Sequence, residues 1–358
     1  MRRKENGRPN NYSSWRWNSP EVASAGKDIM MAVQNLFGHN FTFENKYIGG
    51  SAIDKFNNPL PNDTKDSCKD SAAVILGAVG GPKWDDPNAN IRPEQGLLGL
   101  RELLGVFANI RPVKIFPSLT KTSPLKEDRL NNVDLIVIRE LTGGIYFGEK
   151  TRNENKSSDL CVYHDYEIKR IIRIAADIAK KRKCKLCSVD KANVLETSRF
   201  WRDITKNTIS AEYPEIIIEH ILVDAAAMYL INRPSDFDVI VTENMFGDIL
   251  TDEASMLTGS LGMLPSASLS DTSVGLYEPI HGSAPDIAGK GIANPCGMIG
   301  SIAMLLRHSL NLNEEANIVE KAMHDVIESG ARTQDIAHND DKILNTKEMT
   351  QLIIDKIN

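Results

Sequence analysis

Short apolar runs alternate with amphipathic stretches along residues 20–358. The runs are rich in β-branched residues and show little polar alternation, which is typical of parallel strands covered on both faces. They predict strands at 41–48, 71–79, 133–138, 216–223 and 238–242. Apolar positions spaced three and four residues apart predict helices at 20–37, from 93 onward, and at 165–183, 298–307, 313–330 and 346–357. This order of elements indicates an α/β fold.

The first 18 residues lack this pattern. They contain Arg2-Arg3-Lys4 and Trp15-Arg16-Trp17-Asn18, with no apolar run and no alternation. A targeting peptide needs an apolar segment or an acid-free amphipathic helix, and neither is present. We therefore expect residues 1–18 to be disordered and to form no strand.

The length, composition and net charge of the chain limit the class of protein. A length of 358 residues predicts two domains of about 150 to 200 residues each. The composition is 41% apolar and 25% charged, and no apolar run approaches the roughly 20 residues of a membrane span, so we expect a soluble protein. A net charge of −6 argues against nucleic-acid binding, because phosphate contacts require clustered positive charge. These features favour small-molecule chemistry.

The chain has five cysteines, an odd number that indicates free thiols and a reducing, cytoplasmic compartment. Cys184 and Cys187 form a CxxC motif on a predicted strand. Side chains three apart on a strand point to opposite faces, so this pair is not expected to bind a metal or act as a redox couple.

The stretch 238–252 carries the first candidate chemistry. A buried strand is predicted to pass through Glu243-Asn244 into a helix with Asp248 and Asp252 four residues apart on one face. Two close carboxylates repel each other, and a shared Mg²⁺ or Mn²⁺ would turn that repulsion into binding. The alternative is that both acids only complement the helix dipole near its N-terminus.

Three arginines lie near element ends. On the helix from Pro93, Glu94, Leu97, Leu98 and Arg101 share one face, while Leu100, Leu103, Leu104 and Phe107 form the expected core face. Arg111 and Arg139 follow, Arg139 at the exit of a strand. Together the arginines could hold carboxylates by bidentate hydrogen bonds, although each alone is more often a surface ion pair.

Further candidates lie on loops. Tyr146 is displayed by the glycine-rich segment 141–148, and Lys191 stands at a strand-to-helix junction where a lowered pKa could make it a base. The ordinary alternatives are that Tyr146 is a packed aromatic residue and that Lys191 is a solvated lysine. The glycine-dense loop 275–295 suits close approach by a dinucleotide, but no G-x-G-x-x-G fingerprint occurs, so a standard Rossmann site is not expected.

Taken in order, six motifs resemble the β-decarboxylating dehydrogenase family, which contains isocitrate and isopropylmalate dehydrogenases. The resemblance covers about residues 20 to 358. The motifs lie at 94–101, 107–112, 139–148, 190–195, 247–252 and 281–295. The resemblance implies two α/β domains around a mixed sheet, not a standard Rossmann fold, with the first strand missing or garbled. Residues 1–106 with 259–358 would bind the cofactor, and 107–258 would bind substrate and metal and form the dimer.

The resemblance also implies roles for individual residues. Arg101, Arg111 and Arg139 would bind the two carboxylates of a malate. Lys191 would take the hydroxyl proton as hydride leaves for NAD⁺. Tyr146 would protonate the enolate after CO₂ departs.

The implied metal site needs two chains. Asp248 and Asp252 would hold Mg²⁺ or Mn²⁺ together with Asp224, which also contacts substrate. In this family Lys191 and Asp224 enter the site from the neighbouring subunit, so a homodimer is expected.

The implied substrate is 3-isopropylmalate. Leu97, Leu98 and, across the dimer, Val194 would surround its isopropyl group. The third carboxylate of an isocitrate would be left unpaired against the leucines, at a cost of several kcal/mol. The expected reaction is the oxidative decarboxylation of (2R,3S)-3-isopropylmalate to 4-methyl-2-oxopentanoate and CO₂ in leucine biosynthesis.

The implied cofactor is NAD. Asp286 lies where the family contacts the adenosine ribose, and an acid there accepts the 2′-hydroxyl but repels a 2′-phosphate. The residues at cofactor-binding positions are Glu94, His281, Gly282, Ser283, Ala284, Pro285, Asp286, Ile287 and Asn294. Two other interpretations remain open: a D-malate or tartrate dehydrogenase of the same family, and a catalytically impaired relative.

The chain departs from the family before Pro20. The family has a strand ending Leu-Pro-Gly-Asp-Gly-Ile-Gly where this chain has residues 12–19. Codons TGG-AGA-TGG-AAT for residues 15–18, read one nucleotide later, spell Gly-Asp-Gly and the start of Ile. We therefore hypothesise a compensated frameshift, and a chain without that strand is expected to fold weakly or to have low activity. Resequencing the gene tests this hypothesis.

Overall fold

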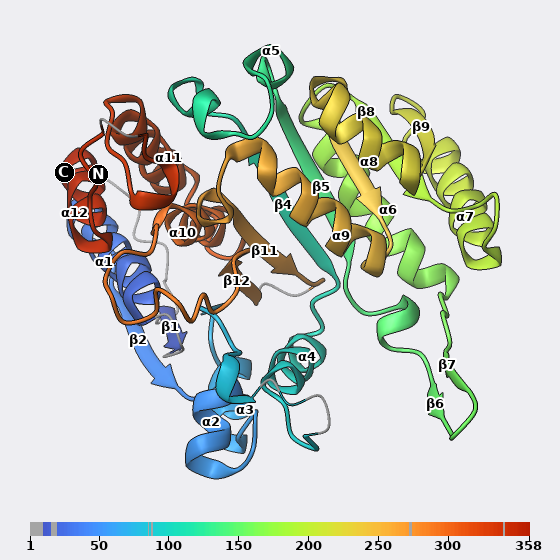
Figure 1. Cartoon of the computed structure of the whole chain (residues 1–358), viewed down its shortest axis with the longest axis horizontal. Coiled ribbons are helices and arrows are strands. Elements are labelled where there is room, and N and C mark those ends of the chain that lie inside the picture. The colour runs from blue at the N-terminus through green and yellow to red at the C-terminus, as the bar shows by residue number, and fades with distance from the viewer. Residues whose placement is uncertain (1–9, 16–19, 85, 87–88, 272–273, 339–340) are drawn as a thin grey trace, which may run out of the picture. The chain divides into compact units, whose positions relative to one another are not determined.

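The computed structural model describes residues 10–15, 20–84, 86, 89–271, 274–338 and 341–358 (Figure 1). The chain divides into two compact units. The first unit is Met1–Gly105 with Gly262–Asn358, and the second unit is Val106–Leu261. None of the helices in the described part of the chain is long and apolar enough to cross a membrane.

The first unit contains a mixed sheet with helices around it (Figure 1). The strand order is β2-β1-β3-β12-β11; β11 and β12 pair antiparallel, and the other pairs are parallel. The strands are β1 (Asn10–Trp15), β2 (Phe41–Lys46), β3 (Ala73–Ile75), β11 (Pro265–Leu269) and β12 (Gly275–Pro279). The helices are α1 (Pro20–Phe37), α2 (Gly49–Phe56), α3 (Asn62–Lys69), α4 (Pro93–Leu104), α10 (Cys296–His308), α11 (Asn313–Glu328) and α12 (Thr346–Ile357).

The strand β1 corrects the prediction for the start of the chain. Asn10–Trp15 pairs in parallel with β2 along its whole length and with β3 at Ser13 and Ser14. The hydrogen bonds between strands use main-chain atoms, so a strand can form in a segment whose side chains do not alternate between apolar and polar. The expectations of disorder and of a missing first strand are therefore wrong for residues 10–15. Residues 1–9 and 16–18 lie outside the described residues, and the frameshift remains a hypothesis.

The second unit is built on its own five strands. Their order is β4-β5-β10-β8-β9, with β4 antiparallel to β5 and the other pairs parallel. The strands are β4 (Ala108–Lys114), β5 (Asp134–Glu140), β8 (Lys185–Asp190), β9 (Ile217–Leu222) and β10 (Val239–Thr242). The helices are α5 (Glu127–Leu130), α6 (Asp165–Lys180), α7 (Glu196–Glu212), α8 (Val223–Asn232) and α9 (Asn244–Ser255). A separate hairpin of β6 (Lys150–Arg152) and β7 (Ser157–Asp159) extends away from this sheet (Figure 1).

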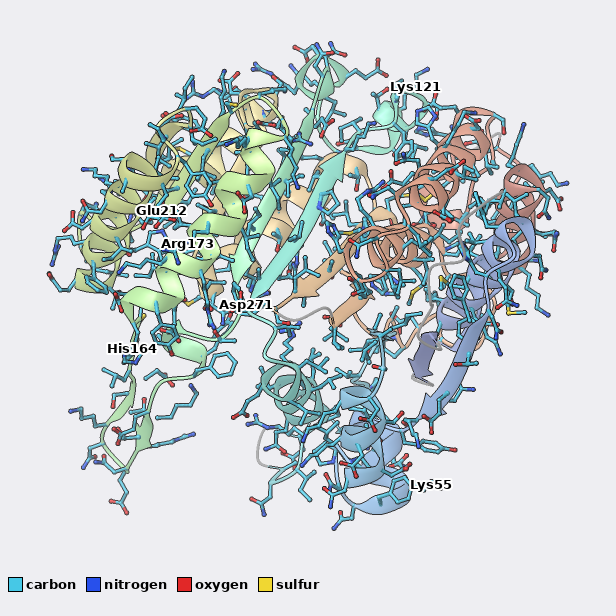
Figure 2. The ribbon with its side chains drawn as sticks, turned by 180° about the vertical axis from the view of Figure 1, so that it is seen from behind. Lys55, Lys121, His164, Arg173, Glu212 and Asp271 are labelled. Atoms are coloured by element: carbon cyan, nitrogen blue, oxygen red, sulfur yellow. The ribbon has the colours of Figure 1, made fainter. Side chains whose placement is uncertain are left out.

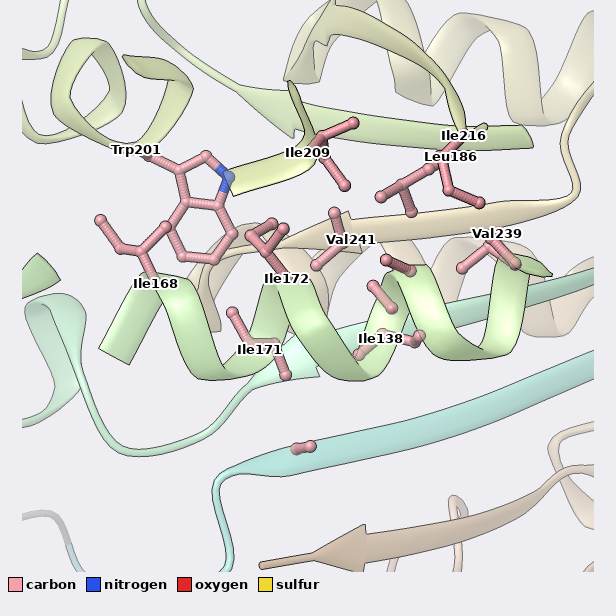
Figure 3. Packing of buried hydrophobic residues seen from close by; sticks show 14 of the residues in the cluster. Ile138, Ile168, Ile171, Ile172, Leu186, Trp201, Ile209, Ile216, Val239 and Val241 are labelled. Atoms are coloured by element: carbon pink, nitrogen blue, oxygen red, sulfur yellow. The ribbon is translucent and has the colours of Figure 1, made fainter. Parts of the chain in front are cut away.

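Helix α6 shows why the second unit folds as it does. Its apolar residues recur every three or four positions, and Ile168, Ile171 and Ile172 are fully buried with Trp201 of α7 against the sheet (Figure 3). The opposite face is polar: Arg173 donates two hydrogen bonds of 2.7 Å to Glu212 of α7 (Figure 2). Packing on one face and an exposed ion pair on the other fix these two helices together.

The substitution Ile172→Ala is expected to lower the free energy of unfolding by about 2 to 5 kcal/mol, because it removes most of a fully buried side chain and leaves a cavity. Urea unfolding measures the change. Arg173→Ala, on the exposed face of the same helix, serves as the control and should change stability by about 1 kcal/mol or less. An equal or larger loss in the control would contradict this account of the core.

All five cysteines are free thiols. Cys187 is buried in β8, whereas Cys184 precedes the strand and is partly exposed.

Candidate active site

The strand β10 is buried at all four positions and leads through Glu243 into α9. Asp248 and Asp252 lie on the exposed side of α9, whereas Leu250 and Ala254 are buried on the other side. The side chain of Asp252 is 68% exposed. The predicted helix and the shared face of the two acids are therefore present.

Two buried arginines meet these two acids. Arg139, at the end of β5, donates a hydrogen bond to Asp248, whose second oxygen accepts one from the Tyr146 hydroxyl at 3.1 Å. Arg111, on β4, donates to Thr251 Oγ1 at 2.5 Å and forms an ion pair with Asp252 at 3.8 Å. The second unit thus brings five of the predicted residues, including Tyr146, into one cluster.

This cluster fits a divalent cation. Partial burial raises the pKa of Asp252, Arg111 opposes that change, and the nearby Asp248 charge adds to it. A cation bound between the two carboxylates would remove this repulsion, and carboxylate oxygens are ligands that Mg²⁺ and Mn²⁺ prefer. Among the described residues of one chain, however, no three His, Cys, Asp or Glu side chains are close enough to hold a metal. Asp224 is therefore not assembled with the other two acids within a single chain.

Asp224 is paired with Lys191 instead. Lys191 follows β8 and donates to Asp224 Oδ1, in the first turn of α8, at 2.5 Å. This hydrogen bond is the largest cause of the lowered pKa of Asp224. Val194 closes the turn after Lys191 and is 62% exposed. These three predicted residues lie together on the surface of the second unit.

The sequence did not predict the residue that stabilises the turn carrying Lys191. Asp190, the last residue of β8, is buried and accepts hydrogen bonds of 2.8 Å on both oxygens from Arg202. It also accepts one from the Ala192 amide at 2.9 Å. An acid directly before the candidate lysine was the available signal, because such an acid can accept main-chain hydrogen bonds two residues later.

In the first unit, α4 presents the predicted mixed face. Pro93 starts the helix, and Gly105 ends it with a φ of 62°. Leu97 is partly exposed and Leu98 is 38% exposed, whereas Leu100 and Leu104 are buried. The guanidinium of Arg101 donates to Glu278 Oε1 at 3.0 Å, and its Nε is buried without a hydrogen-bond partner in the described chain. The two leucines therefore stay available for an apolar group.

The loop after β12 holds the candidate cofactor residues. His281 Nδ1 donates to the Gly282 carbonyl at 3.0 Å, and its Nε2 is buried and has no hydrogen-bond partner among the described residues. Asp286 is exposed in a turn where the Ile287 and Ala288 amides both donate to the Ala284 carbonyl. An unpaired buried ring nitrogen beside exposed main chain fits a polar ligand such as a dinucleotide.

The remaining cofactor candidates differ in exposure. Asn294 is buried and is held by Asp335 Oδ2 at 3.0 Å and by the Cys296 amide at 2.9 Å. Glu94 is exposed in the first turn of α4. Gly282, Ala284 and Pro285 are exposed, and Ser283 and Ile287 are partly buried. Asp335, forty-one residues from Asn294, could not be found by sequence spacing.

Comparison with known proteins agrees with the six motifs. The model of the isocitrate/isopropylmalate dehydrogenase family matches residues 18–353. A 3-isopropylmalate dehydrogenase from Rhodopirellula baltica is 53% identical over 343 residues, which cover 94% of this chain and 96% of that protein. One from Bacillus subtilis is 54% identical over 328 residues, which cover 90% of each chain.

Solved structures show the same fold. An isocitrate dehydrogenase from Methylococcus capsulatus is 32% identical with a TM-score of 0.85, over 97% of this chain and 99% of that chain. A β-decarboxylating dehydrogenase from Thermococcus kodakarensis is 30% identical with a TM-score of 0.78, over 97% and 96%. The predicted fold class is thus confirmed, and the chain belongs to the isocitrate/isopropylmalate dehydrogenase family of oxidoreductases.

Proposed function

We propose that this chain oxidatively decarboxylates (2R,3S)-3-isopropylmalate to 4-methyl-2-oxopentanoate and CO₂ in leucine biosynthesis, with NAD as the cofactor. The observation that carries this proposal is the identity above 50%, over about nine-tenths of the chain, with proteins named 3-isopropylmalate dehydrogenase. Leu97 and Leu98 support it, because they leave apolar surface beside Arg101 where a citrate-type substrate would need a cation.

In this reaction the residues of the second unit bind the charged groups of the substrate and the cation. Arg111 and Arg139 bind substrate carboxylates. Asp248 and Asp252, which pair with these arginines in the single chain, would hold a divalent cation together with Asp224 of a second subunit. When bound, NAD⁺ supplies the hydride acceptor and the divalent cation supplies an electrophile that polarises the C2 oxygen of the substrate.

Two residues move protons. Lys191 of the second subunit accepts the proton of the C2 hydroxyl on Nζ. Burial, followed by the charge of Asp248, raises the pKa of Tyr146, so its phenol stays protonated and serves as the acid for the enolate carbon. Arg101 completes the binding of the malate carboxylates.

The proposed homodimer is supported by exposed apolar side chains around Lys191 and along α8 and α9. At least half of the surface of each is open in the single chain: Val194, Met228, Ile231 and Ile249. Covering them is favourable, at about 25 cal/mol per Å² of apolar surface. A second copy would also bring Lys191 and Asp224 to acids that one chain does not assemble with them.

The preference for NAD rests on Asp286. Its carboxylate is exposed in the loop after β12. An acid in this position accepts a ribose 2′-hydroxyl and repels the 2′-phosphate of NADP.

The experiment that tests the function is NADH formation by the purified chain with Mn²⁺ and 3-isopropylmalate. We expect turnover with 3-isopropylmalate to exceed that with D-malate and isocitrate by about tenfold or more in kcat/KM, since each missing apolar contact costs about 1 to 3 kcal/mol. NAD should be preferred to NADP, and EDTA should abolish activity. Faster turnover of D-malate or tartrate would reassign the substrate, and no turnover of any of them would indicate an impaired relative.

A further inference from the structure

Asn244, the first residue of α9, contacts the buried arginine Arg139. Its side chain is among the most buried polar groups of the second unit, at 1% exposure. Its Oδ1 accepts a hydrogen bond from Arg139 Nε at 3.0 Å and another from Nη2 at 2.8 Å. These two bonds fix the plane of the guanidinium and direct Nη1 at Asp248.

The same asparagine reaches the turn that carries Tyr146. Its Nδ2 donates to the Gly143 carbonyl at 3.3 Å, and its main-chain amide donates to the Tyr163 hydroxyl at 3.0 Å. The Tyr163 ring leaves no room for side chains on the turn, since a Cβ on Gly143 would lie 2.5 Å from it. Gly144 has a φ of 78°, which starts the short 3-10 helix Gly144–Tyr146. Asn244 therefore connects Arg139 and the Tyr146 turn.

Asn244 is also electrically neutral. A buried carboxylate in its place would pair with the Arg139 guanidinium and reduce the positive charge that a ligand carboxylate meets. An amide oxygen orients the same N–H groups and adds no negative charge to that of Asp248, with which Arg139 already pairs. Arg111 has the same kind of contact, because its Nε donates to Asn109 Oδ1 at 2.6 Å. Arg101 donates to a carboxylate, that of Glu278, as Arg139 Nη1 does to Asp248.

We propose that Asn244 is a positioning residue for this reaction, which orients Arg139 and the Tyr146 turn together without placing a second carboxylate, beside that of Asp248, against the guanidinium. Asn109 does the same for Arg111. The expected changes in KM and kcat rest on the proposed function. The expected change in dicarboxylate affinity can be measured even if the chain turns over no substrate.

Two substitutions separate this role from a purely structural one. Asn244→Asp keeps the acceptor for Arg139 but adds a negative charge, whereas Asn244→Ser is neutral and too short to make either side-chain contact. We expect Asn244→Asp to raise KM for 3-isopropylmalate by about 10- to 100-fold with a smaller change in kcat. Asn244→Ser should mainly lower kcat, by about tenfold, because the Tyr146 turn is released. The control Asn207→Asp adds the same charge at an exposed position of α7 and should change neither constant.

The binding arm uses malonate, a dicarboxylate that is not turned over, in calorimetric titrations with Mn²⁺. We expect malonate affinity to fall about tenfold or more in Asn244→Asp and less in Asn244→Ser. Should Asn244→Asp fail to fold, Asn109→Asp gives the same comparison at Arg111. Equal malonate binding by the wild type and the Asp variant overturns the inference, even where the wild type proves active.

The two proposals fail in different ways. A wild type without turnover that binds malonate, with weaker binding in the Asp variant, refutes the proposed function and supports the positioning role. A wild type that turns over 3-isopropylmalate with unchanged constants in both variants refutes the positioning role alone. If both variants have a lower melting temperature but unchanged KM and malonate affinity, Asn244 has only a structural role.

Discussion

Replacing Lys191 with methionine is expected to lower kcat for 3-isopropylmalate by about two to four orders of magnitude, the usual contribution of a positioned proton acceptor. Methionine keeps the length of the side chain but cannot accept a proton. In the free chain the Lys191 amine already contacts Asp224, one of the proposed metal ligands, so its position suits a group that works beside the cation. Steady-state kinetics with Mn²⁺ and NAD measures the loss.

Lys185→Met is the matched control, because Lys185 starts the same strand and its side chain is exposed. It should leave kcat within about twofold of the wild type, as expected for a solvated side chain. A Lys191 variant with ordinary turnover, or a control that is equally impaired, would remove Lys191 from the proposed chemistry.

The subunit that supplies Lys191 can be identified with the same variant. Lys191→Met and Asp248→Asn should each be inactive as homodimers. After the two are unfolded and refolded together, half of the dimers are mixed and each contains one intact site, so about a quarter of wild-type activity should return. If Lys191 and Asp248 act within one chain, no activity returns.

Replacing Glu243 with glutamine is expected to remove a large pH dependence of stability. Glu243 is only 6% exposed, and its burial, followed by the charge of Glu140, raises its pKa from 4.5 to about 7. The folded chain therefore favours the protonated acid. Its stabilising contribution is complete below about pH 4.5 and is lost as the pH rises to about 7, a change of roughly 3 kcal/mol.

Urea unfolding of the wild type and Glu243→Gln between pH 4.5 and 8 measures this effect. The variant should gain about 3 kcal/mol relative to the wild type across that range, because glutamine has no proton to lose. Glu219→Gln, exposed on β9, provides the control for removing one carboxylate. Parallel stability curves for the wild type and Glu243→Gln would show that Glu243 does not titrate in this range.

The elements with strong periodicity were predictable from the sequence. Helix α1 begins at Pro20 and ends at Phe37 as its apolar spacing predicts, and the Asp248 and Asp252 pair lies on the exposed side of α9. The half-exposed leucines of α4 were predictable for the same reason, since position on a helix fixes which face a side chain occupies. The predicted strand 71–79 is shorter, at Ala73–Ile75, although the Leu76 amide still donates to the Tyr277 carbonyl.

Other features could not be predicted from the pattern of apolar and polar residues. The strand β1 depends on main-chain pairing, which does not require apolar alternation. The contacts of Asn244 with Arg139 and Tyr163 join residues about 80 to 105 positions apart, and a spacing rule cannot connect them. The role of Tyr146 came only from the family resemblance, which also favoured Lys191 as a base over a solvated lysine, because a single tyrosine or lysine on a loop has too many ordinary explanations.

The side chains of α4 and the charged cluster of α9 belong to different compact units. Leu97 and Leu98 make none of the hydrogen bonds described above for Arg139, Asp248 and Asn244. New preferences for the group at C3 can evolve by changes at these two leucines while the residues of the charged cluster are inherited unchanged. Members of such a lineage would differ in the group they accept at C3 and share a single reaction.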